Sequence, residues 1–94
     1  MTKFTVEKYQ FEVEAWTPYI TESQTINRFE SFAKMRNHFL QVCSTILEKD
    51  TTQNKDDQLS GYQMASMIAH TNPLPWCFET PAGYRVRAEK RKNA

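Results

Sequence analysis

The chain of 94 residues contains 24% charged, 39% hydrophobic and 13% aromatic residues, and its formal net charge at pH 7 is +1. This balance is typical of a folded globular chain and excludes an intrinsically disordered one. Because so short a chain has room for one core, we expect residues 1–94 to form a single domain, with residues 90–94 as a basic tail.

Membrane and exported proteins are the next classes to be set aside. No apolar stretch approaches the roughly 20 residues of a membrane span, and no charged-then-apolar leader opens the chain. Cys43 and Cys77 lie far apart, without the four or six cysteines of a secreted disulfide scaffold. We therefore expect a soluble, cytoplasmic protein with reduced thiols and no membrane partner.

Residues 4–16 predict a first strand. They are rich in Phe, Val, Tyr and Thr, and from residue 9 onward apolar and polar residues alternate with the period of a half-buried strand. The side expected to be buried carries Tyr9, Phe11, Val13 and Ala15, and the side expected to face solvent carries Gln10, Glu12 and Glu14.

Residues 21–25 are predicted to form a polar connector, followed by a long helix that runs to about Lys49. Asn27 is the predicted N-cap residue, because Glu30 follows three positions later and could complete a capping box. When residues are placed around a helix axis at 100° per residue, the apolar residues gather on one side and the polar residues on the other. The apolar side of the helix should therefore pack on the sheet.

Residues 50–57 lack periodicity and predict a mobile loop. A short second helix should follow, from Gly61 to about His70. Ser60 and Gln63 have the spacing of a capping box at its start.

Residues 76–89 predict a hairpin whose register depends on its loop. A two-residue turn would pair Phe78 with Arg85 and build an aromatic and guanidinium surface suited to stacking bases. A three-residue loop would pair Phe78 with Val86, and Gly83 suits the left-handed position that ends such a loop. We favour the three-residue loop, which leaves Arg85 on a solvent-facing side.

The order strand, long helix, short helix and hairpin predicts an α+β fold. A small antiparallel sheet, made of the N-terminal strand and the C-terminal hairpin, would be covered on one face by one long and one short helix.

Arg36 is the most unusual residue of the predicted long helix, because it falls near the centre of the apolar arc. An unpaired charge there would be costly. One interpretation is that its stem packs while its head reaches solvent or pairs with Glu12 or Glu14. The other is that Arg36 belongs to an interface or an anion site.

The C-terminal segment carries the only strong charge asymmetry. Residues 84–94 hold five basic residues and one acidic residue, whereas the preceding residues hold seven basic and ten acidic. Clustered positive charge attracts a polyanion or an acidic protein surface. Terminal basic runs are also often merely solubilising, so a binding role requires that an ordered strand hold these side chains. The candidate binding residues of this segment are Arg85, Arg87, Lys90, Arg91 and Lys92.

Sequence motifs for catalysis, metals or cofactors are missing. There is no GxSxG elbow, P-loop or dinucleotide fingerprint, and the chain has only two glycines. His38 and Cys43 are five positions apart on the predicted helix and would diverge instead of sharing a metal. We expect no enzyme, no metal and no cofactor.

Two functions remain open. The first is a small non-catalytic protein that regulates or inhibits a protein partner, with Trp16 and Tyr19 as exposed anchors. A host nucleic-acid-processing or defence assembly, and so a nucleoprotein, is the kind of partner that this hypothesis names. The second is a module that contacts the phosphate backbone of RNA or single-stranded DNA through its basic C-terminal strand. A homodimer is an open alternative for so small a core. The short length and the Thr-, Gln- and Asn-rich composition would suit an accessory protein of a phage or plasmid.

Overall fold

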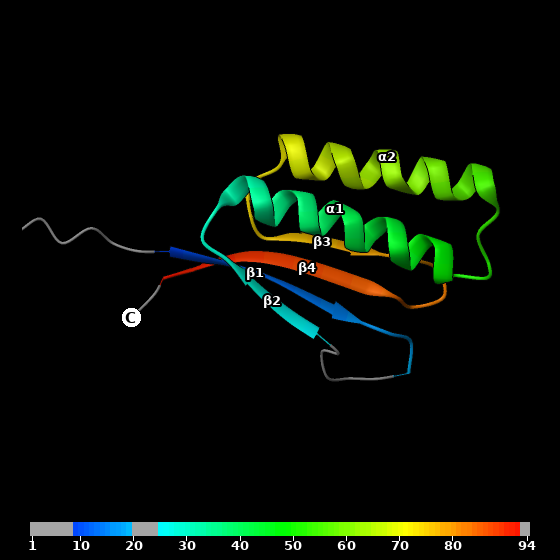
Figure 1. Cartoon of the computed structure of the whole chain (residues 1–94). Helices are drawn as coiled ribbons and strands as arrows, with labels where there is room; N and C mark the ends of the chain where they lie inside the picture. Colours follow the sequence, from blue (N-terminus) through cyan, green and yellow to red (C-terminus); the bar gives the residue numbers. More distant parts are fainter. Residues whose placement is uncertain (1–8, 20–24, 93–94) are drawn as a thin grey trace, which may run out of the picture.

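The computed structural model of the chain describes residues 9–19 and 25–92, which form an antiparallel sheet and two helices. In chain order the elements are β1 (Tyr9–Trp16), β2 (Thr25–Phe29), α1 (Phe32–Lys49), α2 (Lys55–Thr71), β3 (Trp76–Glu79) and β4 (Arg85–Lys92). The strand order is β2-β1-β4-β3, and both helices lie on the same face of the sheet (Figure 1). The predicted α+β fold is confirmed, with one strand more than the sequence indicated.

β1 confirms the predicted strand and the side assigned to Phe11, Val13 and Ala15, but the prediction that Glu12 faces solvent was wrong. Residues 4–8 of the prediction and the side chain of Tyr9 lie outside what the structure describes. Val13 faces the helices and is 1% exposed. Glu12 lies on the opposite side, yet it is also buried, because arginine side chains from both neighbouring strands cover it. We call this opposite side of the sheet, away from the helices, the open face.

β2 is the strand that the sequence analysis missed. Residues 25–29 were expected to end a connector and begin a helix at Asn27, but they pair with β1 in five consecutive positions. The helix begins later, at Phe32, where Ser31 is the N-cap residue and its Oγ accepts a hydrogen bond from Lys34 N–H at 3.3 Å. The prediction of an Asn27 cap was wrong because a strand that is exposed on both sides leaves no apolar alternation to read.

α1 supplies most of the helical part of the core and ends at Lys49, as predicted. Phe39 packs against Trp76 of β3 with ring centroids 5.2 Å apart. The buried residues of α1 are Met35, Phe39, Cys43, Ile46 and Leu47.

α2 is longer than predicted, because it begins at Lys55 and includes part of the expected loop. Its N-cap is Asn54, which forms a capping box with Asp57, so the predicted box of Ser60 and Gln63 was wrong. Small residues face α1: Ala65 and Ala69 are buried, and a Cβ atom added to Gly61 would lie 2.7 Å from a methyl carbon of Leu47.

Asp50 also contradicts the predicted mobile loop. It is the C-cap residue of α1, is 1% exposed, and accepts hydrogen bonds from Thr52 N–H at 2.9 Å and from Ala82 N–H at 3.0 Å. Burial alone would raise the pKa of Asp50, but hydrogen bonds from Thr52, Thr80 and Ala82 outweigh it and lower the pKa to about 2. The segment after α1 is therefore tied to the β3–β4 turn.

The hairpin has the register of the three-residue loop that we favoured. Phe78 pairs with Val86 and Trp76 with Ala88, so these four residues face the core. Gly83 has a φ of 106°, a conformation that L-residues rarely adopt, and its N–H donates to the carbonyl of Thr80 at 3.0 Å.

The predicted boundary of a basic tail at residue 90 was wrong. β4 continues through Lys92 and pairs with β1 along its whole length, while residues 93 and 94 lie outside the described residues. Neither described helix is long and apolar enough to cross a membrane.

Candidate binding surfaces

The basic residues predicted from the C-terminal segment lie mainly on the open face. The antiparallel register places arginines and glutamates beside one another across all four strands. In the described part of the sheet, the charged residues of this face are Glu12, Glu14, Arg28, Glu79, Arg85, Arg87, Glu89 and Arg91. Four positive and four negative charges therefore share one surface.

Two glutamates form ion pairs with three arginines at the centre of the open face. Glu12 receives Arg28 Nε at 3.1 Å and Arg91 Nε at 2.9 Å on its two oxygens. Glu89 binds Arg87 Nη2 at 2.9 Å and Arg91 Nη2 at 2.6 Å. The hydrogen bond with Glu89, followed by the charges of Glu12 and Glu89, raises the pKa of Arg91. The arginines are held in order, as a binding role required, but their charges are largely compensated within the fold.

Arg85 forms a longer ion pair than the other arginines of the open face, and its guanidinium also packs on an aromatic ring. Its guanidinium carbon lies 4.2 Å from the ring centroid of Trp16, whereas its ion pair with Glu79 is 3.9 Å long. A guanidinium over an indole ring is a favourable cation–π arrangement. Trp16 is therefore half-buried beneath Arg85, and the open stacking surface of the rejected two-residue turn does not form.

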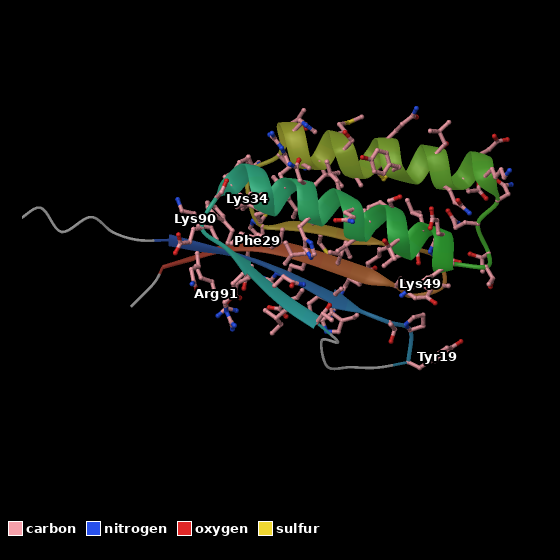
Figure 2. All side chains as sticks on the ribbon, viewed as in Figure 1. Tyr19, Phe29, Lys34, Lys49, Lys90 and Arg91 are labelled. Carbon is pink, nitrogen blue, oxygen red and sulfur yellow. The ribbon has the colours of Figure 1, made fainter. Side chains whose placement is uncertain are left out.

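Tyr19 is the most exposed residue of the predicted site. It is fully exposed and has a φ of 71°, although it is not a glycine. A bulky residue in this region of backbone space is strained. Figure 2 shows Tyr19 at one end of the sheet, with Lys90 and Arg91 at the other, so the predicted site residues do not form one surface.

Arg36 does not join the open face. The predicted pairing with Glu12 or Glu14 was wrong, because those carboxylates lie on the side of the sheet away from α1 and Glu12 binds other arginines. Arg36 is half-buried, and its guanidinium lies 5.6 Å from the ring centroid of Phe32. Within the described part of the chain it forms no ion pair, so the packed stem is the part of the interpretation that the structure supports.

Lys90 lies on the helix-facing side of β4. Lys90 pairs across the strands with Phe11 and lines a cavity of about 550 Å³ where β4 runs past the start of β3. Phe32 and Leu74 supply apolar parts of its wall. Lys92 ends β4, and its side chain lies outside the described residues.

A second cavity, of about 440 Å³, opens between α1 and the ends of β1 and β2. Val42 and Ile46 contribute apolar surface, Trp16 forms a wall, and Lys49 is the charged residue of its lining. His38 also lines it. The Nε2 atom of His38 is buried and has no hydrogen-bond partner in the described part of the molecule, and desolvation lowers the pKa of this imidazole.

Several groups that could support catalysis or metal binding are paired with other residues or buried, whereas the free thiol of Cys77 is exposed. Carboxylate oxygens of Glu12, Glu14 and Glu89 lie within 4.8 Å of one another, but guanidinium groups supply the positive charge that a metal ion would bring. Cys43 is buried, and burial raises the pKa of its thiol, so a reactive thiolate is disfavoured. The ring of His70 bonds the carbonyl of Ser66 at 2.7 Å, in the last turn of α2.

Arg28 and Asp50 were not among the residues predicted from the sequence, and His38 was considered only as a metal ligand. Arg28 could have been found only together with β2, whose register brings it opposite Glu12. The spacing of Asn54 and Asp57 was a readable signal for the start of α2. No family model, curated protein or solved structure matches the chain.

Proposed function

We propose that the chain is a small non-catalytic protein-binding domain that regulates or inhibits its partner by occupying a surface of it, with Tyr19 as a central anchor. The proposal rests on one observation, a fully exposed tyrosine held at a φ of 71°. A backbone outlier of this kind costs of order 1–3 kcal/mol, and such outliers cluster at functional sites. Tyrosine is also among the residues that contribute most to protein interfaces.

The ion pairs of the open face favour a protein partner over a nucleic acid. A phosphate backbone needs cations that are available, and here Arg28, Arg87 and Arg91 each bind a glutamate at 3.1 Å or less. A polyanion would have to displace those carboxylates. A protein surface with its own mixed charges meets no such barrier.

The test is capture of partners by the tagged full chain from a bacterial lysate, with and without nuclease. We expect a protein partner that survives both nuclease and moderate salt. Tyr19→Gly is the informative variant, because glycine relieves the positive φ and should raise stability by about 1 kcal/mol while removing the anchor.

Loss of stability therefore cannot explain a loss of capture by this variant. We expect recovery of the partner to fall at least roughly tenfold. Tyr62→Ala is the matched control, since Tyr62 is an exposed tyrosine on α2. Equal recovery by Tyr19→Gly and the wild-type chain would reject the proposal, and capture that disappears with nuclease would favour the nucleic-acid alternative.

A further inference from the structure

The two edges of the sheet are protected differently. At the β3 edge, Pro75 precedes the strand, Pro81 lies in the following turn, and α2 packs against the strand. Edges are commonly blunted by such prolines and by covering elements. β2 pairs with β1 over five consecutive positions from Thr25 to Phe29, with no proline, lysine or bulge. Among the described strands it has a neighbour on one side only.

The helix-facing side of β2 is also poorly covered. α1 packs mainly on β1 and β4, and α2 on β3. Of the three β2 residues on this side, Thr25 and Asn27 are consequently exposed, and Phe29 is half-buried. The 440 Å³ cavity lies beside this uncovered strand, with Val42 and Ile46 of α1 as apolar lining.

The flank of α1 that borders the cavity has a lysine near each end. His38, Gln41, Thr45 and Lys49 line the cavity, and Lys34 extends the same helical row by one turn. Figure 2 shows Lys34 and Lys49 at opposite ends of α1. At 1.5 Å per residue they are about 22 Å apart, which is the length of six or seven residues of extended chain.

His38 adds to this flank a polar atom that lacks a hydrogen-bond partner among the described residues. Its Nε2 atom is buried without a hydrogen-bond partner among the described residues, and its ring lies 5.0 Å from that of Phe29. A buried polar atom without a partner is unfavourable, so a bound chain that supplies a hydrogen bond would gain affinity there.

We propose that β2 and the adjacent flank of α1 form a docking site at which a partner protein adds an extended, acidic segment to the sheet as a further strand. This inference rests on the proposed protein-binding function and names the segment that the domain would bind. Main-chain hydrogen bonds to β2 supply affinity, and apolar side chains of the segment cover Val42 and Ile46. Acidic residues near its two ends pair with Lys34 and Lys49.

A second copy of this chain fits the site less well. Two β2 strands paired about a two-fold axis would bring both α1 flanks to the same face of a joint sheet. Lys34 and Lys49 of each copy would then border one groove, where like charges repel. The charge of the flank therefore favours an acidic partner segment.

The test uses the isotope-labelled full chain and three capped synthetic peptides, followed by NMR. The probe is Asp-Thr-Val-Thr-Val-Thr-Asp, in which both Asp and both Val lie on the same side of an extended strand. Its comparators replace both Asp by Lys, or the first and last Thr by Pro. We expect the acidic probe to shift the amide signals of residues 25–29 and to slow their hydrogen exchange. Both comparators should bind roughly tenfold more weakly, because one loses the charge pairs and the other loses main-chain donors.

Charge-reversal variants test whether the lysine at the end of α1 pairs with the acidic residues of the peptide. Lys49→Glu should weaken the acidic probe and strengthen the lysine peptide, whereas Lys55→Glu, a matched exposed lysine on α2, should change neither. An absent response at residues 25–29, or an equal response to all three peptides, would overturn the inference. Protection of these amides that grows with protein concentration alone would also overturn it, in favour of a second copy.

The two proposals fail in different ways. If peptides do not bind β2 but lysate capture still depends on Tyr19, only strand addition is rejected. If the acidic probe binds β2 as expected but capture does not depend on Tyr19, the anchor in the proposed function is rejected.

Discussion

The carboxylate of Asp50 accepts a hydrogen bond from the backbone N–H of Ala82 at 3.0 Å, although the two residues are 32 positions apart. Asp50 ends α1, and Ala82 lies in the β3–β4 turn. Thr52 and Thr80 donate to the same carboxylate. One buried acid thus joins the helix layer to the turn that sets the register of β4, the strand that carries most of the predicted binding residues.

Asp50→Asn should lower thermal stability by several degrees. Asparagine has nearly the same shape, but its amide nitrogen cannot accept the hydrogen bonds that one carboxylate oxygen now receives, so buried donors lose their partner. The measurement is the midpoint of thermal unfolding followed by circular dichroism. Asp56→Asn is the control, because Asp56 is exposed in the first turn of α2. Equal midpoints for the two variants would contradict the structural role of Asp50.

The stability conferred by Asp50 should depend on pH with a defined sign. Its pKa is lowered from 3.8 to about 2 in the folded chain, so the unfolded chain binds a proton first as the pH falls. The contribution is therefore complete above about pH 5 and is lost progressively between about pH 4 and pH 2. Urea unfolding of the wild type and Asp50→Asn at pH 6, 4 and 2.5 should give free energies that converge at the acidic end. A constant difference would mean that the carboxylate is not ionised in the folded state.

The hairpin could be predicted from the sequence because its determinants are local. The position of Gly83 selects a three-residue loop, and that loop fixes Phe78 opposite Val86. The two sides of β1 and the end of α1 could likewise be predicted, because apolar residues recur on the side of each element that packs in the core.

β2 and the start of α2 could not be predicted by the same reasoning, because both are exposed on nearly all sides. Without a buried side, apolar residues do not recur at a regular spacing. The predicted first residue of each helix then depended on capping motifs alone, and more than one such motif was present. The charge balance of the open face was hidden for a different reason. Arg28 and Arg91 meet at Glu12 from strands far apart in the sequence, so net charge along the chain said nothing about charge on the surface.

Gly83→Ala should destabilise the hairpin by about 1–2 kcal/mol, since its φ of 106° is unfavourable for any residue with a Cβ atom. Space is not the cause, because the added Cβ atom would lie 3.5 Å from Pro18, an ordinary contact. Gly83→Asn should lose less stability than Gly83→Ala, because asparagine tolerates left-handed conformations better than alanine. Urea unfolding midpoints in the order wild type, Asn, Ala would support this account, and an alanine variant as stable as the wild type would contradict it.

Removing the acids of the open face should create a polyanion-binding surface. The wild-type face carries four arginines and four glutamates in its described part, so Glu12→Gln with Glu89→Gln leaves a net charge of two positive there. Arg28, Arg87 and Arg91 would lose the carboxylates that now hold them. We expect the double variant to bind single-stranded DNA with a logarithmic salt slope of roughly −2, as about three phosphate contacts predict.

The measurement is fluorescence anisotropy of a labelled oligonucleotide at low and physiological salt, on protein whose fold is verified by circular dichroism. Glu30→Gln with Glu48→Gln is the matched control, because both residues are exposed and the change in net charge is the same. If this control gained equal affinity, overall charge and not the open face would be responsible. If the wild-type chain already bound DNA with the same slope, Glu12 and Glu89 would not restrain the arginines in solution, and direct binding of nucleic acid would regain its place beside the protein-binding function.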